Sequence, residues 1–328
     1  MVRTPLKLSR LQILSFRQHV GALDERMSLN AESLRRATWA GLQDSSPRAA
    51  LLSIHARISG VRPHTWQHRS LVQMWGPRFN DYVVSAKDRA VFSLGRLPDG
   101  ALARSRAQET ARQLSAFLKG RRMPFGQAGR AMGVPPNSLR YAALTGTIHM
   151  HWDGAHQPVV WAVAAPRIDP QRARLELARR YLHILGPTTS EAFSRWAGLS
   201  LKEARATFAA LSGELLLART PVSDAWILAS DEATIRTPRP LSTGARFLPS
   251  GDPYFLLWGA DRALLVPQFN RRAALWTARM WPGALLLEGE ISGTWRRTGG
   301  TVMLSAWRHL TGTEQRAVDI EIESLPLL

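Results

Sequence analysis

The first third of the chain combines segments of helical periodicity with one short segment of strand character. Apolar residues recur every three to four positions, which predicts helices over residues 9–17, 30–39, 49–58 and 64–73. Two β-type runs within residues 72–84 are separated by Gly76 and Pro77, which predicts a small hairpin. Helices followed by a hairpin are typical of a winged-helix module.

The same order of elements recurs twice more along the chain. In the second block the predicted hairpin turns at Asp153-Gly154, a dipeptide that favours tight hairpin turns. The blocks share little sequence, so the repeat is one of pattern. The second block has expected helices at 110–120, 125–132 and 136–143 and strands at 146–152 and 159–163; the third has a helix at 172–185, shorter helices ending near 197 and 211, and strands at 215–218 and 225–229.

From about residue 237 the pattern changes to short apolar runs between Gly and Pro residues. Regularly spaced strands of this kind predict a small barrel or sandwich. The expected strands lie at 263–266, 284–295, 301–307 and 317–323, with one helix at 271–279. The expected fold class is α+β, with three tandem winged-helix modules followed by a small C-terminal β-barrel. The corresponding domains are residues 1–108, 109–168, 169–236 and 237–328.

The net charge of the chain indicates the class of its partner. The chain of 328 residues has 43 Lys and Arg against 25 Asp and Glu, a net charge of +18. Most of these cations are arginines, whose planar guanidinium groups suit phosphate, so nucleic acid is the expected class of partner. The chain contains no cysteine, which excludes disulfides, thiolate metal sites and cysteine nucleophiles.

Hydropathy gives no sign of a membrane partner. No run approaches the roughly 18 apolar residues of a membrane span, and charges and Pro5 interrupt the N-terminus, which lacks a signal-peptide core. The expected location is the cytoplasm, in association with the nucleoid. No heptad repeat suggests a dimer, so a monomer is expected.

The turn before the helix expected at residues 49–58 carries the candidate chemistry. Ser46 is a suitable N-cap and Pro47 a suitable first helical residue. Gln43, Asp44 and Ser45 therefore precede the positive end of a helix. In an extended turn, Gln43 and Ser45 share one side and Asp44 points to the other. The alternative is an ordinary capped helix start, in which Asp44 and Ser46 serve only as caps.

Several segments, in a shared order through nearly the whole chain, resemble the winged-helix DNA glycosylases related to AlkZ, the azinomycin-resistance protein. This family has three tandem winged helices and a C-terminal β-barrel. The resembling segments are Gly41-Leu-Gln43 with Pro47-Arg48, Trp75-Gly76, residues 181–189 with Phe193 and Trp196-Ala-Gly198, residues 264–267, and Trp281-Pro-Gly with residues 288–296.

The resemblance implies that the partner is double-stranded DNA, damaged DNA in particular. It also implies excision of alkylated bases, including bulky adducts and crosslinks, by water and without a lysine Schiff base or a cofactor. The family signature is Gln-x-Gln or Gln-x-Asp, and the triplet here is Gln43-Asp44-Ser45. Gln43 is thus expected to position water and Ser45, which replaces the second catalytic side chain, to assist. Asp44 either caps the helix or substitutes as the base. A non-catalytic winged-helix DNA-binding protein, as a lost-activity paralogue or a regulator, is the alternative.

Arginines at predicted helix ends and turns are the expected contacts to the DNA backbone. His149 and His151 share one face of a predicted strand near Asp153, but no third ligand is evident, so no metal is expected. His55 is expected to be a hydrogen-bonded core histidine. The candidate DNA-binding residues are Arg48, Arg121, Arg122, Arg130, Arg140, Arg271, Arg272, Arg296 and Arg297.

Overall fold

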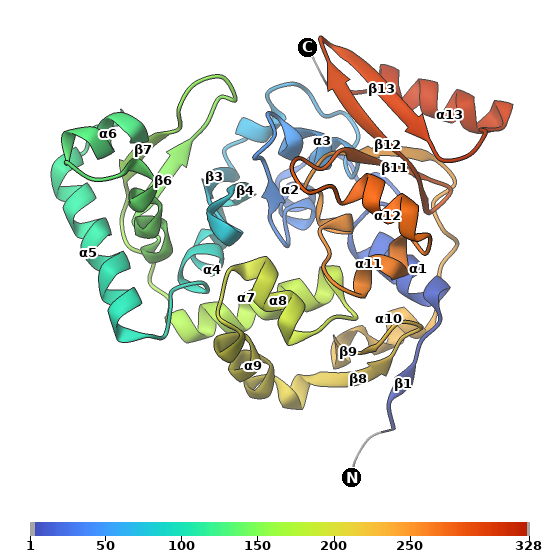
Figure 1. The fold of residues 1–328 in the computed structure, drawn as a ribbon, viewed down its shortest axis with the longest axis horizontal. Helices are drawn as coiled ribbons and strands as arrows, with labels where there is room; N and C mark the ends of the chain where they lie inside the picture. Colours follow the sequence, from blue (N-terminus) through green and yellow to red (C-terminus); the bar gives the residue numbers. More distant parts are fainter. Residues whose placement is uncertain (1–3, 327–328) are drawn as a thin grey trace.

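A computed structural model describes residues 4–326 of the chain (Figure 1). Its strands form three sheets of three strands and one sheet of four strands, with helices around each. The α+β fold class expected from the sequence is therefore confirmed.

The first sheet lies near the centre of the molecule and has the order β2-β4-β3. The expected hairpin is confirmed, since β3 and β4 pair antiparallel from Leu71↔Ser85 to Trp75↔Asp81. The helix expected at 64–73 is wrong: β3 takes its end, and a single 3-10 turn, Thr65–Gln67, remains. The elements are α1 (Arg10–Val20), α2 (Ala31–Ala37), β2 (Leu42–Gln43), α3 (Ala49–His55), β3 (Leu71–Trp75), β4 (Asp81–Ser85) and α4 (Arg89–Leu94).

The second block, green in Figure 1, forms a sheet of order β5-β7-β6. Its hairpin turns through Asp153 and Gly154, as expected. The first helix starts earlier than its apolar pattern indicated, and the helix expected at 136–143 is a 3-10 helix. The elements are α5 (Ala101–Leu118), β5 (Met123–Pro124), α6 (Phe125–Ala131), the 3-10 helix Pro136–Thr145, β6 (Ile148–His151) and β7 (Val159–Ala162).

The third sheet takes a strand from the start of the chain. Strand β1 (Leu6–Lys7) pairs parallel with β8 through Leu6↔Ala218, and the order is β1-β8-β9. Thr189 and Ser200 cap the two shorter helices with their side chains. The remaining elements are α7 (Pro170–Leu185), α8 (Ser190–Ala197), α9 (Leu201–Ala210), β8 (Leu215–Arg219), β9 (Asp224–Leu228) and α10 (Glu232–Arg236).

The C-terminal sheet corrects the expectation of a barrel. It is antiparallel with the order β10-β11-β12-β13, and within residues 4–326 no pairing of β13 with β10 closes it. Two expected strands are helical instead, at 263–266 and 317–323, and the inserted helix lies earlier than expected. The elements are β10 (Ala245–Leu248), α11 (Asp261–Leu265), α12 (Phe269–Leu275), β11 (Gly283–Leu287), β12 (Glu290–Thr298), β13 (Thr301–Ala306) and α13 (Gly312–Glu323).

A capping box explains why residues 317–323 are helical. The Thr311 side chain accepts the backbone N–H of Glu314, whose carboxylate accepts the N–H of Thr311. The period-two alternation of Val, Ile and acidic residues imitates a strand, but Val318 is buried while Ile320 is 66% exposed. The alternation is therefore incidental, and the cap decides the structure.

The largest buried apolar cluster crosses the predicted domain boundaries. It joins Phe16 of α1 and Tyr181 of α7 to Phe255 and to Leu286 of β11. The C-terminal segment is thus packed against the first and third blocks. This packing brings Gly251 against Gln43 of strand β2, with Ser250, Leu256 and residues 279–281 nearby.

Candidate active site

The β2 strand sets the position of the candidate triplet. Gln43 pairs with Tyr82 of β4, and Leu42 is buried in a core cluster. Gly41 precedes the strand at φ +72°, and a Cβ there would lie 2.9 Å from the Tyr82 ring and 3.0 Å from the Phe92 ring. Only glycine allows this turn at so close an approach.

Gln43 and Ser45 face the same cavity, which has a volume of about 320 Å³. Gln43 is half-buried and Ser45 is exposed. The other walls come from the β3–β4 connection and the C-terminal segment. The remaining lining residues are Ser46, Arg78, Asn80, Ser250, Gly251, Leu256, Arg279, Met280 and Trp281.

The Gln43 side chain is held from two sides. Arg78 Nη2 donates a hydrogen bond of 3.0 Å to Gln43 Oε1. On the other side Gly251 lies at φ +82°, where a Cβ would be 3.0 Å from Gln43 Cδ and 3.2 Å from its Cβ. The close approach of Gly251 therefore requires glycine and confines the Gln43 amide.

A buried ion pair holds the Gly251 loop in place. Arg57 Nη1 and Nη2 lie 2.7 and 2.9 Å from the two Asp252 carboxylate oxygens, and Ser53 Oγ donates to Asp252 at 2.7 Å. Asp252 also accepts the backbone N–H of Tyr254. Ser53 of helix α3 and Arg57, just after its end, thus fix the C-terminal loop that packs on Gln43.

Asp44 points away from the cavity into the protein. Its carboxylate accepts the backbone N–H of Ala50 at 2.9 Å and Gln73 Nε2 at 3.0 Å. Burial raises the pKa of Asp44 to about 6, against the opposing effects of the Ala50 hydrogen bond and nearby Arg48. Asp44 therefore caps helix α3, one of the two roles that the sequence predicted for it.

The helix start differs from the expected N-cap at Ser46. The N-cap position is Arg48, in the left-handed region at φ 67°, and its side chain makes no cap hydrogen bond. Ser46 contributes only its carbonyl, which accepts the N–H of Ala49 at 2.9 Å. The capping side chain comes instead from Asp44, six residues before the N–H it accepts.

Arg48 is engaged inside the protein. Its guanidinium lies 3.9 Å from the centre of the Trp66 ring, and His151 stacks on the same ring at 5.4 Å. Arg48 also donates to the carbonyl of Asp153 in the β6–β7 turn. The residue expected to contact DNA thus joins the first block to the second.

A second cavity, of about 460 Å³, continues from the first. It shares Ser46, Ser250, Met280 and Trp281 with it and extends to Arg296 and Arg297. Both arginines are exposed, and Arg296 Nη2 donates to the Met280 carbonyl at 3.0 Å. The triplet cavity therefore opens into a groove edged by two of the predicted DNA-binding residues.

The arginines of the second block lie away from this groove. Arg121 donates to the carbonyls of Phe117 and Leu118 at the end of α5, and Arg122 stacks over Trp161 at 4.4 Å. Both are exposed, as is Arg130. Arg140 is half-buried and donates to the Phe79 carbonyl at 3.3 Å.

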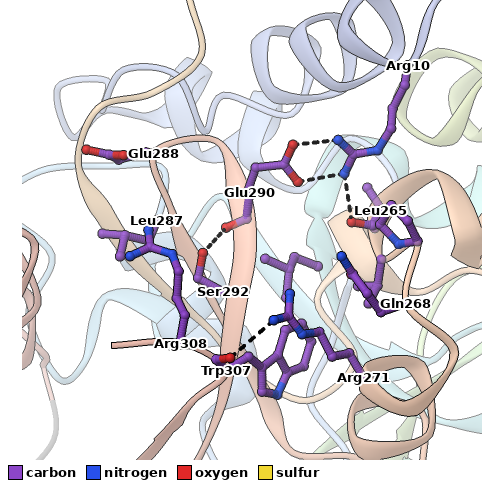
Figure 2. A pocket seen from close by; sticks show the side chains of 13 residues that line it. Arg10, Leu265, Gln268, Arg271, Leu287, Glu288, Glu290, Ser292, Trp307 and Arg308 are labelled. Atoms are coloured by element: carbon purple, nitrogen blue, oxygen red, sulfur yellow. Dashed lines mark hydrogen bonds and ion pairs between the residues drawn. The ribbon is translucent and has the colours of Figure 1, made fainter. Parts of the chain in front are cut away.

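Arg271 lines a separate polar cavity of about 320 Å³ between α12 and β12 (Figure 2), and Arg272 is not among the residues that line it. Figure 2 shows Arg271 beside Trp307, whose carbonyl it contacts at 3.2 Å. In the same view Arg10 makes a bidentate ion pair with Glu290. Arg272 donates to the Val266 carbonyl at 3.0 Å. The structure does not join these two arginines to the triplet cavity.

The histidines have structural partners. His149 lies 2.9 Å from Arg89 Nη1, and burial lowers its pKa to about 4. His55 is buried beside the Ser324 hydroxyl, and burial lowers its pKa to about 4 as well. Residues 4–326 contain no group of three or more His, Cys, Asp or Glu side chains placed to hold a metal ion. Nor is any of their helices long and apolar enough to cross a membrane.

Sequence reasoning missed Arg78, Arg279 and Gly251 as parts of the site. Arg78 follows the Trp75-Gly76 segment, and Arg279 precedes Trp281-Pro-Gly, so both adjoin segments that carried the family resemblance. Their proximity to Gln43 depends on contacts between distant segments, which spacing alone does not reveal.

Comparisons with known proteins show the family and the fold of the chain. The family model for DNA glycosylase AlkZ-like proteins matches residues 37–326, so the chain belongs to the AlkZ-like DNA glycosylase family. A solved structure, the Streptomyces sahachiroi DNA glycosylase AlkZ, has the same fold: the TM-score is 0.78 at 16% identity, over 98% of this chain and 97% of that one. No curated protein matches the sequence.

Proposed function

We propose that the protein is a monofunctional DNA glycosylase, which hydrolyses the N-glycosidic bond of alkylated or crosslinked bases with water positioned by Gln43. The observation that carries this proposal is that Gln43 and Ser45 face one cavity, which opens into the groove bordered by Arg296 and Arg297. A family of DNA glycosylases supplies the class of reaction.

The cavity suits attack by water on a developing cation. Base departure leaves an oxocarbenium-like sugar, and the enzyme must place water beneath its anomeric carbon. The Gln43 carbonyl can accept a hydrogen of that water, and the Ser45 hydroxyl can hold the same molecule. None of the residues lining the cavity is a lysine, so its walls offer no amine for a Schiff base. Asp44, buried as a helix cap, positions the turn.

The same chemistry favours cationic lesions. The glycosidic bond of an N7-alkylguanine is already weakened, because departure neutralises a positive base. An amide and a hydroxyl stabilise a cation less well than a carboxylate does. Cationic lesions need the least transition-state stabilisation from the enzyme, so they suit this site. Alkylated purines and crosslinks are therefore the proposed substrates.

The remaining architecture supports binding of double-stranded DNA by a monomer. Each three-stranded sheet is accompanied by helices that precede its hairpin. We infer that these three units are winged-helix modules, with the first boundary moved from 108/109 to before helix α5 and with strand β1 added to the sheet of the third unit. A net charge of +18 would hold the phosphate backbone without sequence preference, which suits a repair enzyme acting near the nucleoid.

The test is excision from defined duplexes carrying N7-methylguanine, an interstrand crosslink or no damage. The expected result is release of the free modified base, with abasic sites revealed by alkali and no strand break before alkali. Retention of every lesion by the purified protein would contradict the proposal. A strand break before alkali would contradict the monofunctional step.

One observation favours the second candidate, a non-catalytic DNA-binding protein. Arg78 already donates to the Gln43 carbonyl and so occupies one of the two lone pairs with which that oxygen could hold water. Salt-sensitive duplex binding with no excision would establish this alternative.

A further inference from the structure

Arg78 is the cation that directly contacts the candidate catalytic amide. Its Nη2 donates to Gln43 Oε1, and its guanidinium lies 4.9 Å from the centre of the Trp258 ring. Within residues 4–326, no carboxylate oxygen lies within 4.0 Å of it. Its Nε is buried without a hydrogen-bond partner. The Tyr82 hydroxyl lies beside the guanidinium, which therefore carries a positive charge with a neutral neighbour and no ion-pair partner among the described residues.

The backbone at Arg78 adopts an unfavourable conformation. Arg78 and Phe79 have φ of 57° and 59°, in the left-handed region that non-glycine residues avoid. Helix α8 ends against this turn, and a Cβ on Gly198 would lie 3.2 Å from Arg78 N. Such strain persists where surrounding contacts impose it, and it clusters at functional sites.

The chemistry of the contact fixes the orientation of the Gln43 amide. A guanidinium only donates hydrogen bonds, so the carbonyl oxygen of Gln43 must face Arg78 and the amide nitrogen must point away. The carbonyl has a second lone pair, which remains available to a water molecule. Arg78 therefore holds the acceptor end of Gln43 in one direction.

The charge of Arg78 creates a requirement for an anion. An unpaired guanidinium beside a developing oxocarbenium would oppose its formation. Arg279 adds a second cation to the cavity walls, and no acidic residue lines them. In DNA the nearest anion to the anomeric carbon is a phosphate of the same nucleotide.

We propose that Arg78 is a positioning residue that holds the Gln43 amide and binds a phosphate next to the lesion, so that bound DNA neutralises the cation beside the reacting sugar. The proposal rests on the proposed function for the reaction and deepens it. The phosphate contact itself is independent of catalysis and is measurable by binding.

The experiment is a thermodynamic cycle that combines the substitution of Arg78 with the neutralisation of single DNA phosphates. Wild type and Arg78→Ala are bound to duplexes with one uncharged methylphosphonate at each position around an N7-methylguanine. At one position the neutral linkage is expected to weaken wild-type binding about tenfold, as does Arg78→Ala, with no further loss when both are combined. The salt slope of Arg78→Ala is expected to fall by about one.

Two further variants separate charge from geometry. Arg78→Lys keeps the charge but lacks the planar fork, so it is expected to restore most of the affinity and little of the excision rate. Arg316→Ala removes an exposed arginine of α13 outside the cavity and is the matched control. It is expected to show no coupling to any single phosphate.

Failure of this inference is distinguishable from failure of the proposed function. Additive losses at every phosphate, with excision intact, would overturn the role of Arg78 alone. Absence of excision by wild type would overturn the glycosylase, while the binding cycle still decides the phosphate contact. If Arg78→Ala does not fold, wild type and Arg78→Lys are compared on the same set of duplexes. A lower excision rate in Arg78→Lys at retained duplex affinity supports the proposal, and equal excision rates contradict it.

Discussion

At the scale of single residues, the Gln43-Asp44-Ser45 turn divides into two faces. Gln43 and Ser45 line the cavity, while Asp44 is buried beneath helix α3. This division could be anticipated, because alternate residues of an extended segment point to opposite sides. The Arg78 contact could not, because it depends on a left-handed turn 35 positions away.

Ser45 is expected to limit the rate. Ser45→Gln places a second amide on the same face as Gln43, where its carbonyl can offset the charge of the oxocarbenium. Loss of one such electrostatic partner typically costs on the order of a hundredfold in rate, so the substitution is expected to raise single-turnover excision at least about tenfold. Ser305→Gln, exposed on β13 outside the cavity, is the control. An unchanged or lower rate for Ser45→Gln would show that Ser45 is not at the reacting centre.

Asp44 is expected to make stability depend on pH. Its pKa of about 6 in the folded protein lies above the value of about 3.9 for an unfolded chain. Between these values the folded state binds more protons, so the contribution of Asp44 falls as pH rises from about 4 to about 6. The difference in unfolding free energy between wild type and Asp44→Asn is expected to shift against wild type by up to about 3 kcal/mol across this window. Denaturant titrations at a series of pH values measure it, and a constant difference would contradict the burial of a titrating Asp44.

At the scale of elements, sequence patterns predicted the helices and hairpins that are stabilised by contacts between residues close in sequence. The helices expected at 9–17 and 30–39 form as α1 and α2, and the Asp153-Gly154 hairpin forms as expected. The strand predicted at 317–323 was wrong, because the capping box at Thr311 stabilises helix α13 in spite of an alternating apolar pattern. Sheet closure was also beyond local reasoning, since pairing among β10 to β13 depends on the whole C-terminal segment.

The junction of α3 with the Gly251 loop is expected to be essential for the site. Asp252→Ala leaves Arg57 as a buried, uncompensated charge, which typically costs 3–5 kcal/mol, so a loss of about 4 kcal/mol is expected in urea unfolding. Glu191→Ala breaks the exposed pair with Arg205 and is expected to cost less than about 1 kcal/mol. Equal, small losses in the two variants would show that the buried pair does not hold the loop.

At the scale of the whole molecule, the site is a product of long-range assembly. The N-terminal strand β1 completes the third sheet, and one core cluster joins α1, α7 and the C-terminal segment. The cavity lies where this assembly brings β2, the β3–β4 connection and residues 279–281 together. The recurring order of helices and strands along the chain predicted the three blocks. Their arrangement in space depends on apolar surface buried between segments far apart in the sequence, so no single segment predicts it.

Charge also acts at this scale. The excess of cations favours nucleic acid as the class of partner, but individual arginines could not be assigned from position alone. Arg48 and Arg140 make contacts within the protein, whereas Arg296 and Arg297 are exposed along the groove. Which arginines reach the groove is decided by tertiary packing.

The most direct test of the account is the single-turnover rate of N7-methylguanine excision by wild type and by Gln43→Ala, at equal saturation of the duplex. The account predicts excision by wild type and a loss on the order of a hundredfold or more in the variant, with duplex affinity nearly unchanged. Equal rates for the two proteins would contradict the assignment of the reaction to the Gln43 cavity.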